Sequence, residues 1–475
     1  MVISTIADGL GRGAESVSDT FSAVFMEPVI RLGVTGLSRA GKTVFITSLV
    51  SNLIDRARMP GLVAAREGRI TAAFLQPQPS DLLPRFEYER HLNALIARDP
   101  YWPDSTRSIS ELRLSLRVQP NGLLSAVQGP RTIHIDIVDY PGEWLLDLSL
   151  LDKSYKDWSV SVLQTMETHD IGAKYQALVS EADGAQDLHE PAAQNLAESY
   201  TDYLDIARKA GFYNCTPGRF LLPGDLAGSP ALTFAPLTPL DKPPRRSLWR
   251  EMERRYEAYK ARIVKPFFRE HFARIDRQIV LVDVLGAIHK GPQAVADMRQ
   301  GMADILSAFR PGQNAFLSKV FLGRRVEKIL FAATKADHLH HSQHGRLTGL
   351  VEALLKDARS LAQFKGAETK ALSVAALRTT TEETRKHDGV DIDCVRGTLL
   401  NADGSRGKQA ALYPGALPDE PSQLLAEAAV GAKNWLDADY EVMNFAPASL
   451  SLAANEGPPH IRLDQAAEFL IGDRL

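Results

Sequence analysis

The octapeptide GLSRAGKT at residues 36–43 decides the fold of this chain. It follows the apolar segment 29–34, which predicts a buried strand, and it leads directly into residues 44–55, whose pattern predicts a helix. A strand, a GxxxxGK[ST] loop and a helix in this order form the phosphate-binding P-loop arrangement. We therefore predict that the loop holds the phosphates of a nucleotide at the N-terminus of the helix.

Each part of this loop has a physical role toward a phosphate. Glycines let the backbone turn tightly, so that successive N–H groups converge on phosphate oxygens, and the helix N-terminus adds about half a positive charge. Lys42 is predicted to act as the catalytic cation near the β- and γ-phosphates, and Thr43 to offer its hydroxyl to Mg²⁺. The predicted nucleotide-binding residues of the loop are Ser38, Arg39, Ala40, Gly41, Lys42, Thr43 and Val44.

The composition is that of an ordinary globular protein. The chain has 475 residues, of which 44% are apolar and 24% charged, so we expect a core with large insertions or two to three domains. A net charge of −3 provides no general electrostatic attraction to nucleic acid or to an acidic membrane. Cys215 and Cys394 lie far apart and suggest neither a disulfide framework nor a metal site, which suits a reducing cytoplasm.

The N-terminal 28 residues predict a helical leader rather than an export signal or a membrane span. They lack a basic n-region, and no apolar run in the chain reaches 18 residues. One helical face carries Val17, Phe21, Val24 and Phe25. We expect this face to pack on the core of a cytoplasmic protein, with peripheral association at the inner membrane as the alternative.

Six strand candidates alternate with helices, the pattern of a doubly wound α/β sheet. The predicted strands cover residues 29–35, 111–118, 132–138, 278–284, 328–333 and 369–374. The segment 278–284 is nearly all apolar and therefore central, whereas 111–118 alternates and is half exposed. We predict a P-loop NTPase core with a mostly parallel six-stranded sheet.

Long segments interrupt this core and are predicted to be insertions. The core is assigned to residues 29–56, 111–144, 278–379 and 463–475. The predicted insertions are residues 57–110, which lead to the first switch loop, residues 145–277, which are helical, and residues 380–462, which contain a small β-hairpin.

The segment Asp139-Tyr140-Pro141-Gly142 at the end of the third strand supplies the acidic residue and the γ-phosphate sensor that nucleotide hydrolysis requires. Asp139 is predicted to hold Mg²⁺ through a water, and the N–H of Gly142 to bond the γ-phosphate and respond when it leaves. The DxxG pattern also ends a strand at Asp283, but strand order favours Asp139, and we expect Asp283 to be a strand-end turn residue.

The segment Thr334-Lys335-Ala336-Asp337 closes the fifth strand and predicts the base site. The carboxylate of Asp337 can accept hydrogen bonds from guanine N1 and N2, a pair that adenine cannot donate. The stem of Lys335 can stack on the base, and Thr334 precedes it at the strand end. A charged helix start is the alternative interpretation.

A backbone N–H for guanine O6 is expected after the sixth strand, from Val374 or Ala375. In the first switch loop, just before the second predicted strand, the sequence offers several possible Mg²⁺ ligands. Ser105, Thr106 and Ser108 compete as its Mg²⁺ ligand, and we choose Thr106.

Two residues are candidates for a part in hydrolysis itself. Arg107 can act as an arginine supplied in cis, with an ordinary surface arginine as the alternative. Glu143 stands where Ras-like proteins carry a water-orienting glutamine, and its charge faces that of the γ-phosphate. We expect slow turnover, from about 10⁻⁴ to 10⁻² s⁻¹.

Four motifs together resemble the bacterial YcjX family over nearly the whole chain. They are VTGLSRAGKTVFITSL at 34–49, DYPGEWL at 139–145, QIVLVD at 278–283 and PHIRLDQA at 459–466. The resemblance implies a Ras/Gα-like core that binds GTP or GDP with Mg²⁺, an association with the bacterial stress response, and a gene neighbourhood shared with a predicted membrane protein. It supplies no cellular target.

Three functions remain in competition at this stage. The first is a GTP-hydrolysing switch whose insertions form a helical lid and a partner surface. The second is an ATP-dependent P-loop enzyme such as a small-molecule kinase, against which Asp337 argues. The third is a nucleotide-bound scaffold that hardly turns over and recruits a membrane partner, which the charge of Glu143 favours.

Overall fold

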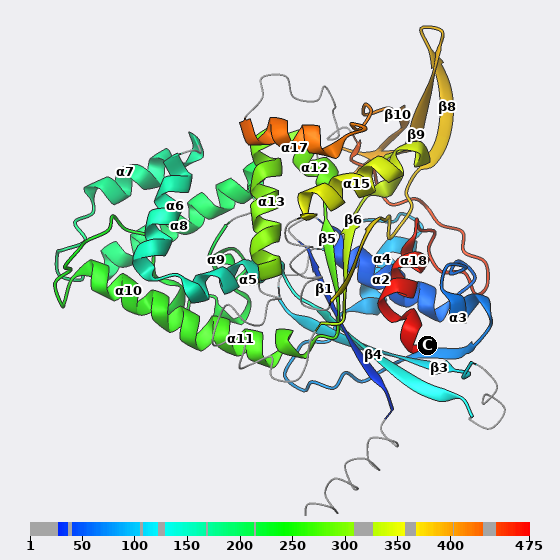
Figure 1. Cartoon of the computed structure of the whole chain (residues 1–475), viewed down its shortest axis with the longest axis horizontal. Coiled ribbons are helices and arrows are strands. Elements are labelled where there is room, and N and C mark those ends of the chain that lie inside the picture. Colours follow the sequence, from blue (N-terminus) through cyan, green and yellow to red (C-terminus); the bar gives the residue numbers. More distant parts are fainter. Residues whose placement is uncertain are drawn as a thin grey trace, which may run out of the picture.

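A seven-stranded sheet forms the centre of the molecule, in the order β2-β3-β4-β1-β5-β6-β7 (Figure 1). The computed structural model describes residues 27–36, 40–104, 108–121, 129–167, 170–212, 215–307, 326–356, 367–401, 403–430 and 443–475. The strands are β1 (Val29–Gly36), β2 (Ile70–Gln76), β3 (Ser110–Val118), β4 (Arg131–Asp139), β5 (Arg277–Val282), β6 (Lys328–Ala333) and β7 (Glu368–Ser373). Strands β4, β1, β5, β6 and β7 run parallel, and β3 and β2 complete the sheet in antiparallel pairing.

All six predicted strands are confirmed to within two residues at their ends, and β2 is the strand that the sequence did not reveal. It lies in the segment predicted to be an insertion before β3, and it pairs with β3 from Ile70 to Gln76. Ala72 and Ala73 have low strand propensity, and most of β2 is only partly buried. An edge strand of this kind shows no apolar alternation to detect.

Helices cover both faces of the sheet and bury its alternating side chains. Helices α2 (Lys42–Ile54) and α18 (Leu463–Ile471) pack with Ile279 and Leu281 on one face. Helices α12 (Val284–Lys290), α13 (Pro292–Ser307) and α15 (His344–Leu354) pack with Val280 and Val282 on the other. Each fully buried aliphatic side chain contributes about 1.5–3 kcal/mol to folding. Both layers of helices therefore hold the carboxyl ends of the strands in place, where the loops with the predicted motifs begin.

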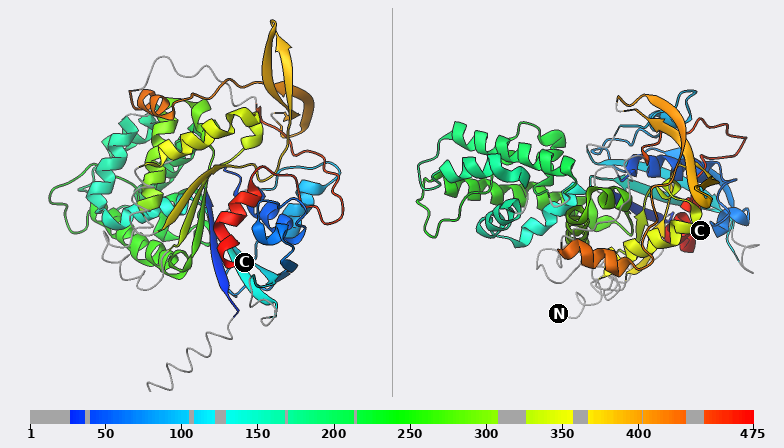
Figure 2. Two further views of the ribbon diagram at one scale, coloured as in Figure 1. Left: turned by 45° about the vertical axis from the view of Figure 1, so that its right-hand side comes forward. Right: turned by 90° about the horizontal axis from the view of Figure 1, so that it is seen from above.

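The predicted helical insertion forms a lobe to one side of the sheet (Figure 2). Helix α5 (Glu143–Leu146) leads from β4 into this lobe, whose helices are α6 (Tyr155–Glu167), α7 (Ala173–Glu181), α8 (Glu190–Ala210), α9 (Gly218–Leu221), α10 (Leu248–Tyr259) and α11 (Lys265–Glu270). Aromatic rings fill its interior: Trp158 stacks on Tyr256 at 5.1 Å between ring centroids and meets Phe234 edge-on at 5.6 Å. Aromatic pairs of this geometry add about 0.5–1.5 kcal/mol beyond burial.

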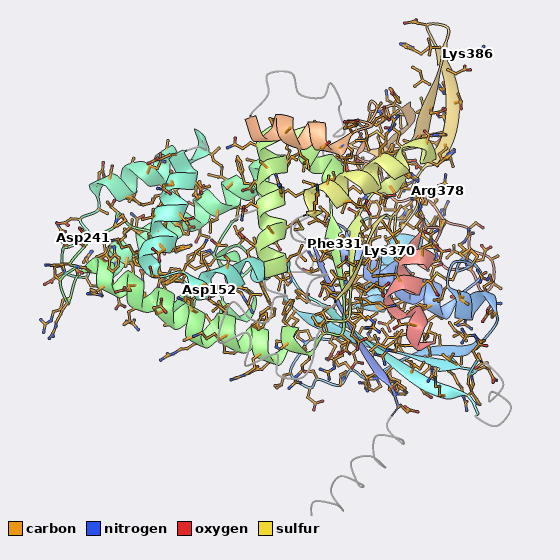
Figure 3. All side chains as sticks on the ribbon, viewed as in Figure 1. Asp152, Asp241, Phe331, Lys370, Arg378 and Lys386 are labelled. Atoms are coloured by element: carbon orange, nitrogen blue, oxygen red, sulfur yellow. The ribbon has the colours of Figure 1, made fainter. Side chains whose placement is uncertain are left out.

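A separate three-stranded antiparallel sheet projects from the core, in the order β10-β9-β8. Its strands are β8 (Thr381–His387), β9 (Val390–Leu400) and β10 (Arg406–Leu412). Figure 3 shows Lys386 at its far end, whereas Phe331 of β6 lies within the core. The predicted hairpin is therefore confirmed as β9 and β10, and the strand β8, TEETRKH, was hidden by its lack of apolar residues.

Three short α-helices lie outside the helical lobe and the two helical layers. They are α3 (Val63–Arg66), α4 (Tyr88–Ile96) and α17 (Pro421–Val430). Among the described residues, no helix combines the length and the apolar character that a membrane crossing requires. The predicted helical leader falls on residues 1–28, and residues 1–26 lie outside the described part of the chain.

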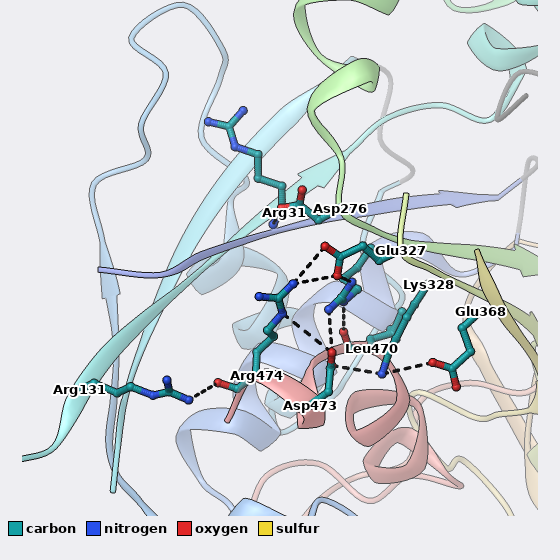
Figure 4. Close-up of polar contacts among 10 residues, drawn as sticks. Arg31, Arg131, Asp276, Glu327, Lys328, Glu368, Leu470, Asp473 and Arg474 are labelled. Atoms are coloured by element: carbon teal, nitrogen blue, oxygen red, sulfur yellow. Dashed lines mark hydrogen bonds and ion pairs between the residues drawn. The ribbon is translucent and has the colours of Figure 1, made fainter. Parts of the chain in front are cut away.

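An ion-pair network anchors the C-terminal residues to the end of the sheet opposite the motif loops (Figure 4). Arg277 of β5 is only 1% exposed, and its guanidinium donates to the Leu470 carbonyl at 3.0 Å and to Asp473 at 2.9 Å, and also to Glu327. Arg474 donates to Glu327 at 2.9 Å from an exposed position. Arg277 is therefore the buried centre of the network.

Replacing Arg277 by alanine is expected to lower the free energy of unfolding by about 2–4 kcal/mol, because it leaves the Leu470 carbonyl and two carboxylates without their shared donor. Arg474→Ala is the matched control and is expected to cost less than about 1 kcal/mol, since this arginine is half exposed. Urea unfolding of both variants measures the difference, and equal effects would contradict the central role of Arg277.

Candidate functional site

The octapeptide loop joins β1 to α2 through two glycines that no other residue can replace without strain. Gly41 has a φ of +79° and caps the N-terminus of α2. A side chain at Gly36 would lie 2.6 Å from the Leu281 carbonyl oxygen of the neighbouring strand. The loop therefore combines a left-handed turn with close backbone packing, and Ala40 is buried within it. Ser38 and Arg39 lie outside the described residues.

Lys42 and Thr43 begin α2, two residues before the predicted start of the helix at residue 44. The ammonium of Lys42 donates to the Gly36 carbonyl at 2.7 Å, so the side chain folds back over the loop. Thr43 is 7% exposed, and its backbone carbonyl accepts from the Thr47 hydroxyl at 2.8 Å. Val44 follows in the same turn. The charge of Lys42 is thereby placed at the helix N-terminus, where anions are favoured.

Asp139 is the last residue of β4 and is paired in register with Val34 of β1, directly beside the loop. Its side chain is 1% exposed. The hydroxyl of Thr43 and the carboxylate of Asp139 are hard oxygen donors, the kind that Mg²⁺ prefers. The donor chemistry of these two residues therefore fits a magnesium ion. Thr106 and Arg107 lie outside the described residues.

Glu143 begins helix α5, directly after Gly142, which caps that helix. The side chain of Glu143 is 5% exposed, and within the described part of the chain its Oε2 atom has no hydrogen-bond partner. A buried carboxylate oxygen without a donor is costly, so a partner beyond the described side chains is expected to bond it. A water or a ligand group beside the loop would satisfy it.

Asp147 connects the segment after Gly142 to the helical lobe, and sequence reasoning missed it. Its Oδ1 accepts from the Gly218 N–H at 2.7 Å, and its Oδ2 accepts from the Tyr259 hydroxyl at 2.5 Å. Gly218 packs so closely that a side chain there would meet the Glu143 carbonyl oxygen at 2.1 Å. No sequence pattern distinguishes Asp147, because its partners lie 71 and 112 residues away.

Burial raises the pKa of Asp147 to about 6, despite the hydrogen bonds from Tyr259 and Gly218. The folded protein thus holds a proton that the unfolded chain releases above its ordinary value of 3.8. The contribution of Asp147 to the free energy of unfolding is therefore greatest below pH 4. It declines as the pH rises to about 6, by up to about 3 kcal/mol, because each unit of pKa shift corresponds to about 1.36 kcal/mol.

We expect Asp147→Asn to remove this decline, because asparagine keeps the shape and does not ionise. Urea unfolding of wild type and variant at several values from pH 4 to pH 7 separates the slope from any constant offset. Parallel profiles for the two proteins would show that Asp147 does not titrate in this window.

Trp144 is also held by the helical lobe. Its indole N–H donates to the Leu222 carbonyl at 3.0 Å, and the Arg219 guanidinium lies 3.2 Å from the ring centroid. Phe267 meets the ring edge-on at 5.5 Å. Together with Asp147, these contacts mean that any movement of the segment after Gly142 must be accommodated by the lobe.

The fifth-strand motif forms a loop at the same edge of the sheet, two strands away from β1. Thr334 donates to the Val282 carbonyl, and Lys335 adopts a left-handed conformation with its ammonium paired to Asp283. Asp283 also caps α12 by accepting from the Gly286 N–H at 3.0 Å. The expectation that Asp283 is a strand-end turn residue is therefore confirmed.

Asp337 is 4% exposed and is held by a threonine that the sequence analysis missed. Thr379 donates twice to Oδ2 of Asp337, from its backbone N–H at 2.9 Å and from its hydroxyl at 2.6 Å. The hydroxyl of Thr380 donates to the Asp337 carbonyl at 2.5 Å. These bonds fix the orientation of the carboxylate, so a guanine that bonds both oxygens must share Oδ2 with Thr379.

The structure differs from the prediction for the two amides assigned to guanine O6. The N–H of Val374 donates to the Ala333 carbonyl at 2.7 Å, and that of Ala375 to the Ile461 carbonyl at 3.1 Å. Both amides are therefore engaged, because β7 continues its ladder and the C-terminal segment pairs with Ala375. A contact to O6 in this conformation would have to come from another group.

The C-terminal motif at 459–466 makes structural contacts at the end of β7, the strand next to β6. Arg462 donates to the Ser373 hydroxyl at 2.9 Å, and Asp464 accepts from the Gly61 N–H at 2.7 Å. His460 contacts the Arg58 carbonyl at 2.7 Å. The motif thereby joins the end of β7 to the segment after α2.

Comparison with known proteins covers the whole of this site. A family model described as "YcjX-like family, DUF463" matches residues 30–475. The protein named Ras-like GTPase YcjX of Escherichia coli (strain K12) is 38% identical over 464 residues, which span 94% of this chain and 96% of the relative. Another Ras-like GTPase YcjX, from Shewanella oneidensis, is 34% identical over 475 residues and 94% of each chain.

Proposed function

Since the chain belongs to the YcjX-like family, we propose that it binds GTP with Mg²⁺, hydrolyses it slowly and changes conformation with the state of the nucleotide. The observation that carries this proposal is the placement of the octapeptide loop, Asp139 and Asp337 at one edge of the sheet, after β1, β4 and β6. Ligands of α/β sheets bind outside the carboxyl ends of the strands where the chain order reverses, which here is at β1. The names of both relatives agree with this assignment.

The phosphates are assigned to the loop and to the N-terminus of α2. Backbone N–H groups from Ala40 to Val44 would face the phosphate oxygens, and Lys42 would exchange its bond with the Gly36 carbonyl for them. Thr43 and Asp139 would hold Mg²⁺, with Thr106 as a further ligand. The ion, when bound, neutralises charge that develops on the β- and γ-phosphate oxygens.

Glu143 is proposed to orient the attacking water and, at the same time, to limit the rate. Its unpaired Oε2 can accept a hydrogen bond from that water, but its negative charge opposes the γ-phosphate. The Gly142 N–H is proposed to contact the γ-phosphate, so that its loss relaxes the segment held by Asp147 and Trp144. The helical lobe would then report the state of the nucleotide.

Glu143→Gln is expected to raise the rate of GTP hydrolysis about tenfold, which corresponds to about 1.4 kcal/mol in the barrier. Glutamine keeps the hydrogen-bonding shape and removes the opposing charge. Phosphate release under single-turnover conditions measures the rate, and Glu327→Gln at the opposite end of the sheet is the charge-matched control. A fall in rate would instead identify Glu143 as the base that accepts the proton of water.

A nucleotide-bound scaffold is the second candidate, and the charge of Glu143 is the observation that favours it. In that case wild type binds GTP without measurable turnover, and the bound state recruits a membrane partner through the lobe or the three-stranded sheet. A role in the bacterial stress response rests on the family resemblance alone. Failure of Lys42→Ala to complement a deletion strain under stress would support that role, and full complementation would oppose it.

A further inference from the structure

Four polar side chains meet where the three-stranded sheet joins the core, apart from the nucleotide site. His340 and His341 follow Asp337 by three and four residues. Glu382 comes from β8 and Asp393 from β9. Because Glu382 pairs with Val395, two residues from Asp393, both carboxylates lie on the same face of the sheet. Figure 3 shows the neighbouring Arg378 at the base of this sheet, far from Lys386 at its tip.

Three of these side chains converge with the spacing that a metal ion requires. The Nδ1 atom of His341 lies 2.6 Å from Glu382 Oε2, and the Nε2 atom of His340 lies 3.7 Å from the same oxygen. One donor atom from each of the three residues lies within 4.8 Å of the others. Zinc holds nitrogen and oxygen ligands at about 2.0–2.2 Å, so tetrahedral ligand atoms stand about 3.3 Å apart. Small side-chain shifts reach this geometry, since His341 is 68% exposed.

The second nitrogen of His340 has the support that metal-bound histidines usually have. Its Nδ1 atom lies 2.9 Å from the Ser342 hydroxyl and 3.4 Å from Asp393 Oδ2. With its proton on Nδ1, the ring donates to these oxygens and directs the Nε2 lone pair toward Glu382. The Ser342 N–H also lies 3.4 Å from Nδ1, which favours the other tautomer when no metal is bound.

Glu382 presents its two carboxylate oxygens to different partners. Its Oε1 atom pairs with Arg378 at 3.4 Å, whereas Oε2 faces the two imidazoles. The Oε2 atom, which contacts His341 at 2.6 Å when no metal is bound, is therefore placed to act as a monodentate ligand.

We propose that His340, His341 and Glu382 form a binding site for one zinc-type divalent cation, with Asp393 orienting His340. Two imidazoles with one carboxylate suit zinc and its neighbours in the transition series, whereas Mg²⁺ prefers oxygen ligands. The ion would clamp the loop after β6 to β8. It would also stiffen the base loop, because Thr380, two residues before Glu382, bonds the Asp337 carbonyl.

Calorimetric titration of ZnCl₂ into the EDTA-treated, nucleotide-free full chain tests this proposal independently of GTP binding. Wild type is expected to show one saturable site, which His341→Ala and Glu382→Gln each weaken at least tenfold. His387→Ala, an exposed histidine at the far end of β8, is the matched control and should bind like wild type. Co²⁺ should produce the strong visible absorption of a tetrahedral site in wild type and in the control.

Two outcomes would overturn the site: wild type without saturable zinc binding, or His341→Ala and Glu382→Gln variants that bind as tightly as wild type. In the first case the cluster is a set of histidine–carboxylate ion pairs only. In the second case zinc binds elsewhere. Unchanged thermal unfolding of the metal-free variants verifies that the substitutions leave the fold intact.

Discussion

Lys42→Ala is expected to weaken GTP binding at least a hundredfold, equivalent to about 3 kcal/mol, and to abolish measurable hydrolysis. The ammonium lies at the start of α2 over the loop, bonded to the Gly36 carbonyl at 2.7 Å. In the complex it would exchange that bond for charge-assisted bonds to the β- and γ-phosphates, which are among the strongest in proteins. Alanine removes this charge. The conformation of the loop should persist, because it depends on Gly36 and Gly41.

Titration of GTP in the presence of Mg²⁺ measures the loss for Lys42→Ala. Lys386→Ala is the control, because this lysine lies at the tip of the three-stranded sheet. The control variant should bind GTP like wild type. Retention of affinity within about threefold in Lys42→Ala would mean that the octapeptide loop does not hold the triphosphate.

Asp337→Asn is expected to invert the choice of base. Guanine offers donors at N1 and N2, whereas xanthine has a carbonyl at position 2 in place of the amino group. With its oxygen on Thr379, the asparagine would present its amide NH₂ where Asp337 presents Oδ1. The amide NH₂ would face the amino group of guanine, which is also a donor, whereas it can donate to the carbonyl of xanthine. We expect GDP affinity to fall about a hundredfold and XDP affinity to rise by a similar factor.

The experiment compares GDP and XDP titrations of wild type, Asp337→Asn and the exposed control Asp388→Asn. The control should retain the wild-type preference. Equal losses for both bases in Asp337→Asn, together with a lowered unfolding temperature, would show that Asp337 supports the loop through Thr379 and Thr380 rather than reading the base.

The parts of this protein that sequence reasoning predicted well are those set by local patterns. The P-loop was found because glycine, lysine and threonine occupy fixed positions between an apolar strand and a helix, and the central strand β5 because its residues 279–282 are all apolar. Asp139 was predicted at the end of a strand and Asp337 in the loop after a later strand, and the structure has them at the end of β4 and just after β6. In each case the determining interactions lie within a few residues of the motif.

Contacts distant in sequence explain what was missed. Ala375 was predicted to donate to the base, but its N–H is bonded to Ile461, 86 positions further along the chain. Asp147 is important because Gly218 and Tyr259 are brought to it by folding. Thr379 is one of several hydroxyl residues after β7, and only the structure identifies it as the partner of Asp337. Strand β2 lacks an apolar face and is recognised only by its pairing with β3.

Isothermal titration of wild type and Asp337→Ala with GTP, GDP and ATP, each with Mg²⁺, tests the central claim most directly. We predict that wild type binds GTP and GDP at least a hundredfold more tightly than ATP, and that Asp337→Ala loses this preference. ATP binding equal to or tighter than GTP binding in wild type would contradict the assignment of the base site and indicate an ATP-dependent P-loop enzyme.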